Sequence, residues 1–310
     1  MEHDHDHDEH GHDEHGHTHD ISGLSGKKIF WVTLLNATIT ITEIIGGIVS
    51  GSLSLLSDAM HNFSDTLSIV ITYVANRIGA KPKDEKKTFG YKRAEILAAF
   101  INSLVLTVIS IFLIYEAIDR FLNPQSIETG VMLIVAVIGL LANLFSVILL
   151  QKDSKKSMNI KSSYLHMLSD TLSSVGVILG GLIIRFWNVT WVDPLITVLV
   201  ALYIFKEAIE ILKESINILM QSSPELDYSA IISDVEKIEH VNNMHHVHAW
   251  RMDEENVFFE AHIDIEDMTL SNAQGIMQTI EELLKDHYHI HHVTLQVETA
   301  QCCEPVVFHE

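Results

Sequence analysis

The sequence has only two cysteines, Cys302 and Cys303, and they are adjacent. A small secreted domain held together by disulfides needs several separated cysteines, so that class is excluded, and a reducing cytosolic setting fits better. Basic residues are also scarce, with 20 Lys and Arg against 41 Asp and Glu. The resulting net charge of −21 argues against nucleic acid as a partner, because phosphates bind to basic surfaces. Cations are the expected partners.

Several common motifs are missing as well. The chain has no HExxH helix, no nucleophile elbow and no phosphate-binding glycine loop, so it does not read as an enzyme. Residues 1–20 lack the basic start and the apolar run of a signal peptide.

The acidic charge lies at the two ends of the chain. Residues 1–20 contain eight acidic residues and eight histidines, and residues 214–310 contain 19 acidic residues against three basic ones. We predict three parts: a disordered His/Asp-rich tail (1–26), a membrane domain (27–213) and a cytosolic metal-binding and dimerisation domain (214–310). The tail either collects cytosolic metal weakly or is a solvated segment or cloning remnant.

The middle part contains six stretches of about 20 predominantly apolar residues, the length that crosses a bilayer core. Most loop cations lie in the connections 79–94 and 152–161. The positive-inside rule then places both termini in the cytoplasm of a multi-pass protein, in the inner or plasma membrane or, in a eukaryote, in an organelle membrane. The spans lie at roughly 29–50, 53–78, 95–118, 130–151, 162–186 and 192–213.

A ten-residue motif occurs twice. Residues 61–70 read HNFSDTLSIV and residues 166–175 read HMLSDTLSSV, with seven identical positions. The copies fall in the second and fifth spans, which cross the membrane in opposite directions. This pattern is typical of an inverted repeat of three plus three helices, whose substrate site lies at the midplane between the halves.

Each copy places a histidine four residues before an aspartate: His61 and Asp65, then His166 and Asp170. One helical turn puts both side chains of a pair on one face, and ionisable groups inside a membrane mark functional sites. Two imidazoles and two carboxylates suit tetrahedral Zn²⁺ better than Mg²⁺, Ca²⁺ or Cu(I), while Co²⁺, Cd²⁺, Ni²⁺ and Fe²⁺ are not excluded. Because protons compete with metal for imidazole, we hypothesise that a divalent ion leaves the cytosol in exchange for protons by alternating access.

Other polar residues in the spans are interpreted differently. Asp58 has no acidic counterpart in the fifth span, where Ser163 takes its place, and it is interpreted as an entrance or packing residue. Helix packing is also the favoured interpretation for the lone polar residues Asn36, Glu43, Asn102 and Asn143.

The periodicity changes after the sixth span, where helices at 227–239 and 271–287 alternate with strands at 244–253, 256–266 and 290–298. The predicted fold is therefore a polytopic helical membrane protein followed by an αββαβ domain, with helices on one face of a three-stranded sheet. The nine histidines between residues 240 and 292 indicate a second, regulatory metal site, although an acidic dimerisation domain explains the composition too. Strand alternation predicts His246 and His248 on the face opposite His245.

These motifs resemble the cation diffusion facilitator family of divalent-metal transporters, specifically its zinc-type branch. The resemblance covers essentially residues 28–300 and rests on EIIGGIVSGSLSLLSDAMHNFSD, TFGYKRAEILAAF, HMLSDTLSSVGVILGG, HHVHAW, FEAHIDI and HHVTLQVE. It implies a homodimeric metal/proton antiporter in a lipid bilayer, with six helices, a metallochaperone-like cytosolic domain and a transport site made by the HNFSD and HMLSD pairs. His61, where some members have Asp, implies a preference for zinc over cadmium.

The resemblance also implies ligands in the cytosolic domain. His245, His262 and Glu298 fall at positions that bind metal in relatives, and Cys302 and Cys303 resemble C-terminal cysteines that do so in some. Two departures put further ligands in doubt: Gln296 stands where some relatives have a ligand histidine, and the loop 79–93 has no histidine. The ligand-rich ends alone would also permit a membrane-anchored metal sensor or storage protein.

Overall fold

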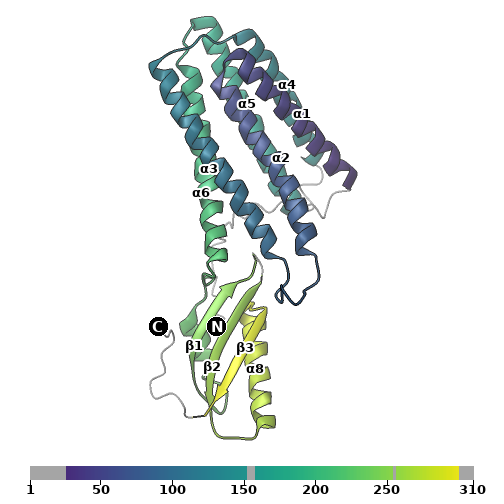
Figure 1. The fold of residues 1–310 in the computed structure, drawn as a ribbon, viewed down its shortest axis with the longest axis vertical. Helices are drawn as coiled ribbons and strands as arrows, with labels where there is room; N and C mark the ends of the chain where they lie inside the picture. The colour runs from purple at the N-terminus through teal and green to yellow at the C-terminus, as the bar shows by residue number, and fades with distance from the viewer. Residues whose placement is uncertain (1–25, 152–157, 254–255, 300–310) are drawn as a thin grey trace, which may run out of the picture. The chain divides into compact units, whose positions relative to one another are not determined.

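The computed structural model describes residues 26–151, 158–253 and 256–299 (Figure 1). Six long helices come first: α1 (Gly26–Ser50), α2 (Leu53–Gly79), α3 (Arg93–Leu122), α4 (Thr129–Gln151), α5 (Met158–Trp187) and α6 (Val192–Leu219). A small α+β segment follows: α7 (Tyr228–Val235), β1 (Val241–Arg251), β2 (Val257–Ile265), α8 (Leu270–Tyr288) and β3 (His292–Glu298). This order confirms the predicted six helices followed by αββαβ. The largest difference in the helices is the end of α6, which lies at Leu219 instead of residue 213.

Three helices within the described residues are long and apolar enough by length and composition to cross a membrane. They are Arg93–Leu122, Thr129–Ile148 and Met167–Trp187. α2 is more polar because Asp58, His61 and Asp65 lie on it. Large apolar side chains such as Ile45 and Phe112 are each 58% exposed, which is the expected state of a lipid-facing surface.

The chain forms two compact units. The first comprises Met1–Thr66 and Ala117–Val200, as far as these are described. In it α4 packs against both α1 and α5 (Figure 1). A small apolar cluster of Leu55, Met132, Ala136 and Val177 joins α2, α4 and α5. This packing holds residues 53–66 of α2 and the whole of α5 in one unit.

The N-terminus of α2 is held by a residue from α6. The carboxylate of Asp193 accepts hydrogen bonds from the backbone N–H groups of Leu53 and Ser54, at 2.8 and 3.2 Å. It also accepts from the Ser52 and Ser54 hydroxyls, both at 2.6 Å. First-turn N–H groups have no partner inside a helix, and the helix dipole is positive there, so a buried carboxylate is well placed. Gly51, with φ at +70°, makes the tight turn that precedes this helix.

The second unit comprises Leu67–Glu116 and Ala201–Glu310, as far as these are described, and includes the three-stranded sheet. Its strands lie in the order β1-β2-β3, with β1 antiparallel and β3 parallel to β2. A parallel pair needs a crossover connection, which α8 provides. The helices cover one face, where Ile231 of α7 and Ile280 and Leu284 of α8 pack on Phe259 and Ile263 of β2. The predicted layer arrangement is therefore confirmed.

A β-bulge interrupts β1 and corrects one prediction. His245 pairs with His262, but His248 pairs with Glu260, so three steps along β1 match two along β2. His246 adopts φ of +51° within this bulge. Because cross-strand partners share a face, His245 and His248 lie on the same face, and the predicted opposite placement of His248 is wrong. The His246 ring also stacks on His262, with centroids 4.5 Å apart, so its predicted placement opposite His245 is wrong as well.

Candidate metal centres

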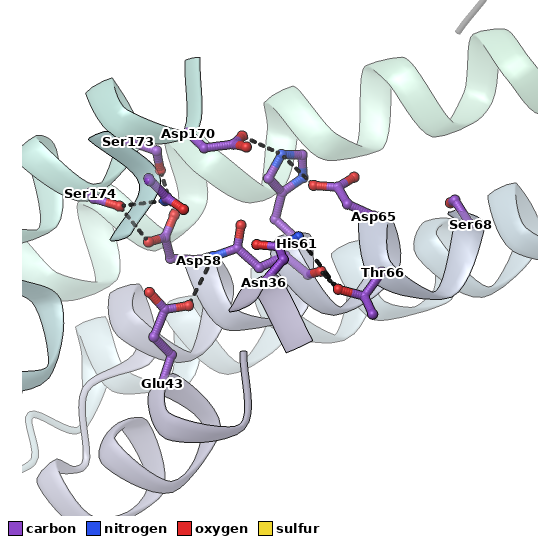
Figure 2. Close-up of polar contacts among 12 residues, drawn as sticks. Asn36, Glu43, Asp58, His61, Asp65, Thr66, Ser68, Asp170, Ser173 and Ser174 are labelled. Carbon is purple, nitrogen blue, oxygen red and sulfur yellow. Dashed lines mark hydrogen bonds and ion pairs between the residues drawn. The ribbon is translucent and has the colours of Figure 1, made fainter. Parts of the chain in front are cut away.

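The membrane site is built from α2 and α5. His61 and Asp65 lie one turn apart on α2, so their side chains emerge on one face of that helix. Asp170 lies on α5 and is 2% exposed. His61 is thereby placed between carboxylates from two helices, as Figure 2 shows.

The distances in this group are short enough for one ion. His61 Nε2 lies 3.2 Å from Asp170 Oδ1 and 3.7 Å from Asp65 Oδ2. One ligand atom from each of the three residues lies within 4.8 Å of the others. An imidazole nitrogen and carboxylate oxygens at this spacing fit a small divalent cation such as Zn²⁺. The structure thus brings together three of the four residues that the repeat predicted.

The fourth predicted residue is His166. Its backbone belongs to α5, one turn before Asp170, but its side chain lies outside what the structure describes. Its place in the site therefore stays a prediction.

Two further carboxylates lie in the same unit. Both oxygens of Asp58 accept hydrogen bonds from α5, from Ser173 Oγ at 2.8 Å and Ser174 Oγ at 3.2 Å (Figure 2). Glu43 accepts a hydrogen bond from Asn62 at 2.8 Å. Sequence reasoning interpreted Asp58 as an entrance or packing residue and Glu43 as a packing residue. It missed the contacts of Asp58 because its partners lie 115 and 116 positions away, and nothing local marks them.

A second group of ligand atoms lies on the sheet. His262 Nδ1 is 2.9 Å from Glu298 Oε1, and His245 Nε2 is 3.5 Å from Glu298 Oε2. Ligand atoms of the three residues lie within 4.8 Å of one another, across neighbouring strands β1, β2 and β3. Two imidazoles and one carboxylate are a zinc-type donor set that leaves one tetrahedral position for another ligand.

Amide side chains orient this second group. Asn243 Oδ1 accepts from His245 Nδ1 at 2.7 Å, which leaves the Nε2 lone pair directed toward Glu298. The side-chain amide of Gln296 donates a hydrogen bond to Glu298 Oε1 at 2.9 Å. Sequence reasoning treated Gln296 only as a missing ligand and overlooked Asn243.

Further potential ligands were predicted in the cytosolic domain. Cys302 and Cys303 lie outside the described residues. His240 forms a separate ion pair with Glu266 at 2.7 Å, and the neighbouring carboxylate raises the pKa of His240. Within the described residues, the membrane group and the sheet group are the only clusters of three or more potential ligands with this spacing.

Two family models match consecutive parts of the chain. A family model for the cation efflux transmembrane domain matches residues 29–220, and one for the cytoplasmic domain of cation efflux proteins matches residues 223–300.

Curated relatives extend over nearly the whole chain. A cadmium, cobalt and zinc/H(+)-K(+) antiporter of Bacillus subtilis is 40% identical over 286 residues, covering 91% of this chain and 92% of the relative. The metal cation efflux system protein CzcD of Cupriavidus metallidurans is 36% identical over 286 residues, covering 92% and 90%. The zinc transporter ZitB of Pectobacterium atrosepticum is 38% identical over 288 residues, covering 92% and 89%.

Proposed function

Because the chain belongs to the cation efflux family, the family that its motifs resemble, we propose that it exports divalent metal cations, Zn²⁺ foremost, from the cytosol in exchange for protons. Family membership makes the chain a multi-pass membrane transporter and not an enzyme. The names of the Bacillus and Pectobacterium relatives support zinc as substrate, and the name of the Cupriavidus relative supports metal cation efflux. The name of the Bacillus relative also supports cobalt and cadmium as further substrates and proton exchange.

One observation carries the proposal: the approach of His61, Asp65 and Asp170 within the membrane domain. Charged and ionisable groups are expensive in a bilayer, so three of them at ligand spacing need a cation or proton as compensation. We infer that His166, one turn before Asp170, completes a four-ligand site. A metal ion that enters the site displaces protons from its ligands, which couples the two fluxes.

The ends of the chain have supporting roles in this proposal. His245, His262 and Glu298 bind a regulatory Zn²⁺ in the cytosol, joined by Cys302 and Cys303. The domain around them forms the contact of a homodimer, which the match to a dimerisation-type cytoplasmic domain supports. Both termini lie in the cytoplasm, and the tail 1–26 gathers metal for the membrane domain 27–213.

Flux into proteoliposomes tests the proposal. Protein is reconstituted with a zinc-sensitive dye inside the vesicles, and Zn²⁺ entry is recorded with and without an imposed pH gradient. We expect the gradient to accelerate entry and His61→Ala to abolish it. Ser146→Ala is the matched control, because Ser146 is a buried residue of α4 whose hydroxyl donates a hydrogen bond to the Ala142 carbonyl of its own helix. Zinc entry that ignores the pH gradient would contradict proton exchange, and normal entry with His61→Ala would contradict the site.

A further inference from the structure

Glu43 is an unusual residue among those that the structure describes, because it is their only buried glutamate, with 1% exposure. Its Oε2 accepts a hydrogen bond from Asn62 Nδ2 at 2.8 Å (Figure 2). Its Oε1 is also buried, and no hydrogen-bond donor of the described chain reaches it. If the Glu43 carboxyl group were ionised, only one hydrogen-bond donor would stabilise its negative charge.

Packing fixes the carboxyl group in this place. A Cβ atom built on Gly139 of α4 would lie 2.2 Å from Glu43 Oε1, so the glycine leaves the room that the carboxyl group occupies. α4 contains no ionisable residue that could neutralise a charge there. Gly139 therefore leaves room for the Glu43 carboxyl group but offers it no side chain as a hydrogen-bond or ion-pair partner.

Two acidic residues lie in the same group of polar residues as Glu43. They are Asp58 of α2 and Asp170 of α5 (Figure 2). Asp58 differs from Glu43 because donors reach both of its oxygens, from Ser173 and Ser174. Burying a carboxylate that is short of donors, beside like charges, costs more than burying the neutral acid.

A metal ion is not the ligand that this position fits. Neither group of three or more potential ligands within the described residues includes Glu43. Divalent cations in proteins need several converging donors, whereas a proton needs one oxygen. The structure therefore favours a proton as the species that Glu43 binds.

We propose that Glu43 is a proton-binding residue of the transport cycle, separate from the metal ligands. Its carboxyl group holds a proton when the site of His61, Asp65 and Asp170 is free of metal, and releases it as H⁺ when the cation enters. Asn62, the partner of Glu43, directly follows His61 in α2, so the positive charge arrives close to the carboxyl group and stabilises its ionised form. This inference rests on the proposed metal/proton exchange and assigns one of the exchanged protons.

The test counts protons released when Zn²⁺ binds to the full-length protein in weakly buffered detergent solution. Wild type is compared with Glu43→Gln, which keeps an oxygen acceptor for Asn62 and cannot ionise. We expect Glu43→Gln to bind Zn²⁺ with an affinity within about threefold of wild type and to release about one proton fewer per ion. Ser146→Ala, the control used for zinc flux, removes no ionisable group and should release as many protons as wild type. Equal proton release by Glu43→Gln and wild type would overturn the proposal.

Infrared difference spectra keep the proposal testable even if Glu43→Gln does not fold. The wild-type protein should lose a carbonyl band of a protonated carboxyl group when Zn²⁺ is added, and labelling with ¹³C-glutamate should shift that band. A band that does not shift, or no such band, overturns the proposal. The proposed transport function would be contradicted by a different result, namely unchanged zinc flux in His61→Ala. Failure of the Glu43 proposal and failure of the transport proposal are therefore distinguishable.

Discussion

His61 Nε2 lies 3.2 Å from Asp170 Oδ1, although the two residues are 109 positions apart. The contact joins the histidine of the first repeat copy to the aspartate of the second. The ligand atoms therefore lie close together only while α2 and α5 keep their present relative position. A movement of one repeat against the other would change the ligand set, which is the requirement of alternating access.

The coordination of bound zinc gives a first prediction. In a variant whose cytosolic site is disrupted by His262→Ala, Cys302→Ser and Cys303→Ser, X-ray absorption should show four nitrogen and oxygen ligands at about 2.0–2.2 Å. Adding Asp170→Asn should weaken zinc binding more than about 100-fold, since even outer partners of metal sites contribute 10–100-fold. Sulfur ligands, or binding unaffected by Asp170→Asn, would contradict the assignment.

The cytosolic site depends on Asn243 as well as on its ligands. Asn243→Ala should weaken zinc binding at His245, His262 and Glu298 by about 10–100-fold, because His245 loses the acceptor that orients its ring. Isothermal titration of full-length protein that carries Asp65→Asn, which silences the membrane site, measures this. Asn242→Ala, an exposed neighbour in β1, is the control and should have no effect. Equal affinities in the two variants would show that Asn243 does not position the histidine.

The bulge at His246 should respond to side-chain shape. His246→Val should be less stable than His246→Asn by about 1–2 kcal/mol, because β-branched residues tolerate positive φ poorly and asparagine tolerates it well. At His248, which has ordinary strand geometry, valine should be at least as stable as asparagine. Thermal unfolding of the four variants gives the comparison. If the valine and asparagine variants have the same order of stability at both positions, the backbone of residue 246 is not constrained as described.

The Asp193 contact should be the strongest stabilising interaction at the start of α2. Asp193→Ala leaves four buried donors without their acceptor, and each costs about 1–3 kcal/mol, so we expect a loss of at least about 3 kcal/mol. The melting temperature in detergent should fall accordingly. Thr197→Val is the control, because Thr197 is equally buried and its hydroxyl donates a hydrogen bond to the backbone carbonyl of Asp193, within its own helix. A melting temperature that is equal in both variants would exclude this role for Asp193.

Most local features of the structure could be predicted from the sequence. Six apolar stretches, the αββαβ order and the His61 and Asp65 pair all follow from periodicity, because residues four apart on a helix share a face. The repeated motif also predicted that Asp170 belongs to the site, because matching motifs in spans of opposite direction meet in an inverted repeat.

Contacts between distant residues were beyond this reasoning. Asp193 reaches Leu53 across 140 positions, and Gly139 accommodates Glu43 on another helix. The bulge at His246 was missed because alternation assumes an unbroken ladder, and only pairing with β2 shows the extra residue. Such features depend on tertiary packing and leave no periodic signal.

Zinc flux into proteoliposomes by three variants tests the central claim most directly, that metal crosses the membrane through the site on α2 and α5. Asp65→Asn and Asp170→Asn should each reduce the initial rate more than about 100-fold at equal amounts of reconstituted protein. His262→Ala, which alters only the cytosolic site, should still transport zinc. Wild-type rates from both aspartate variants would contradict the account.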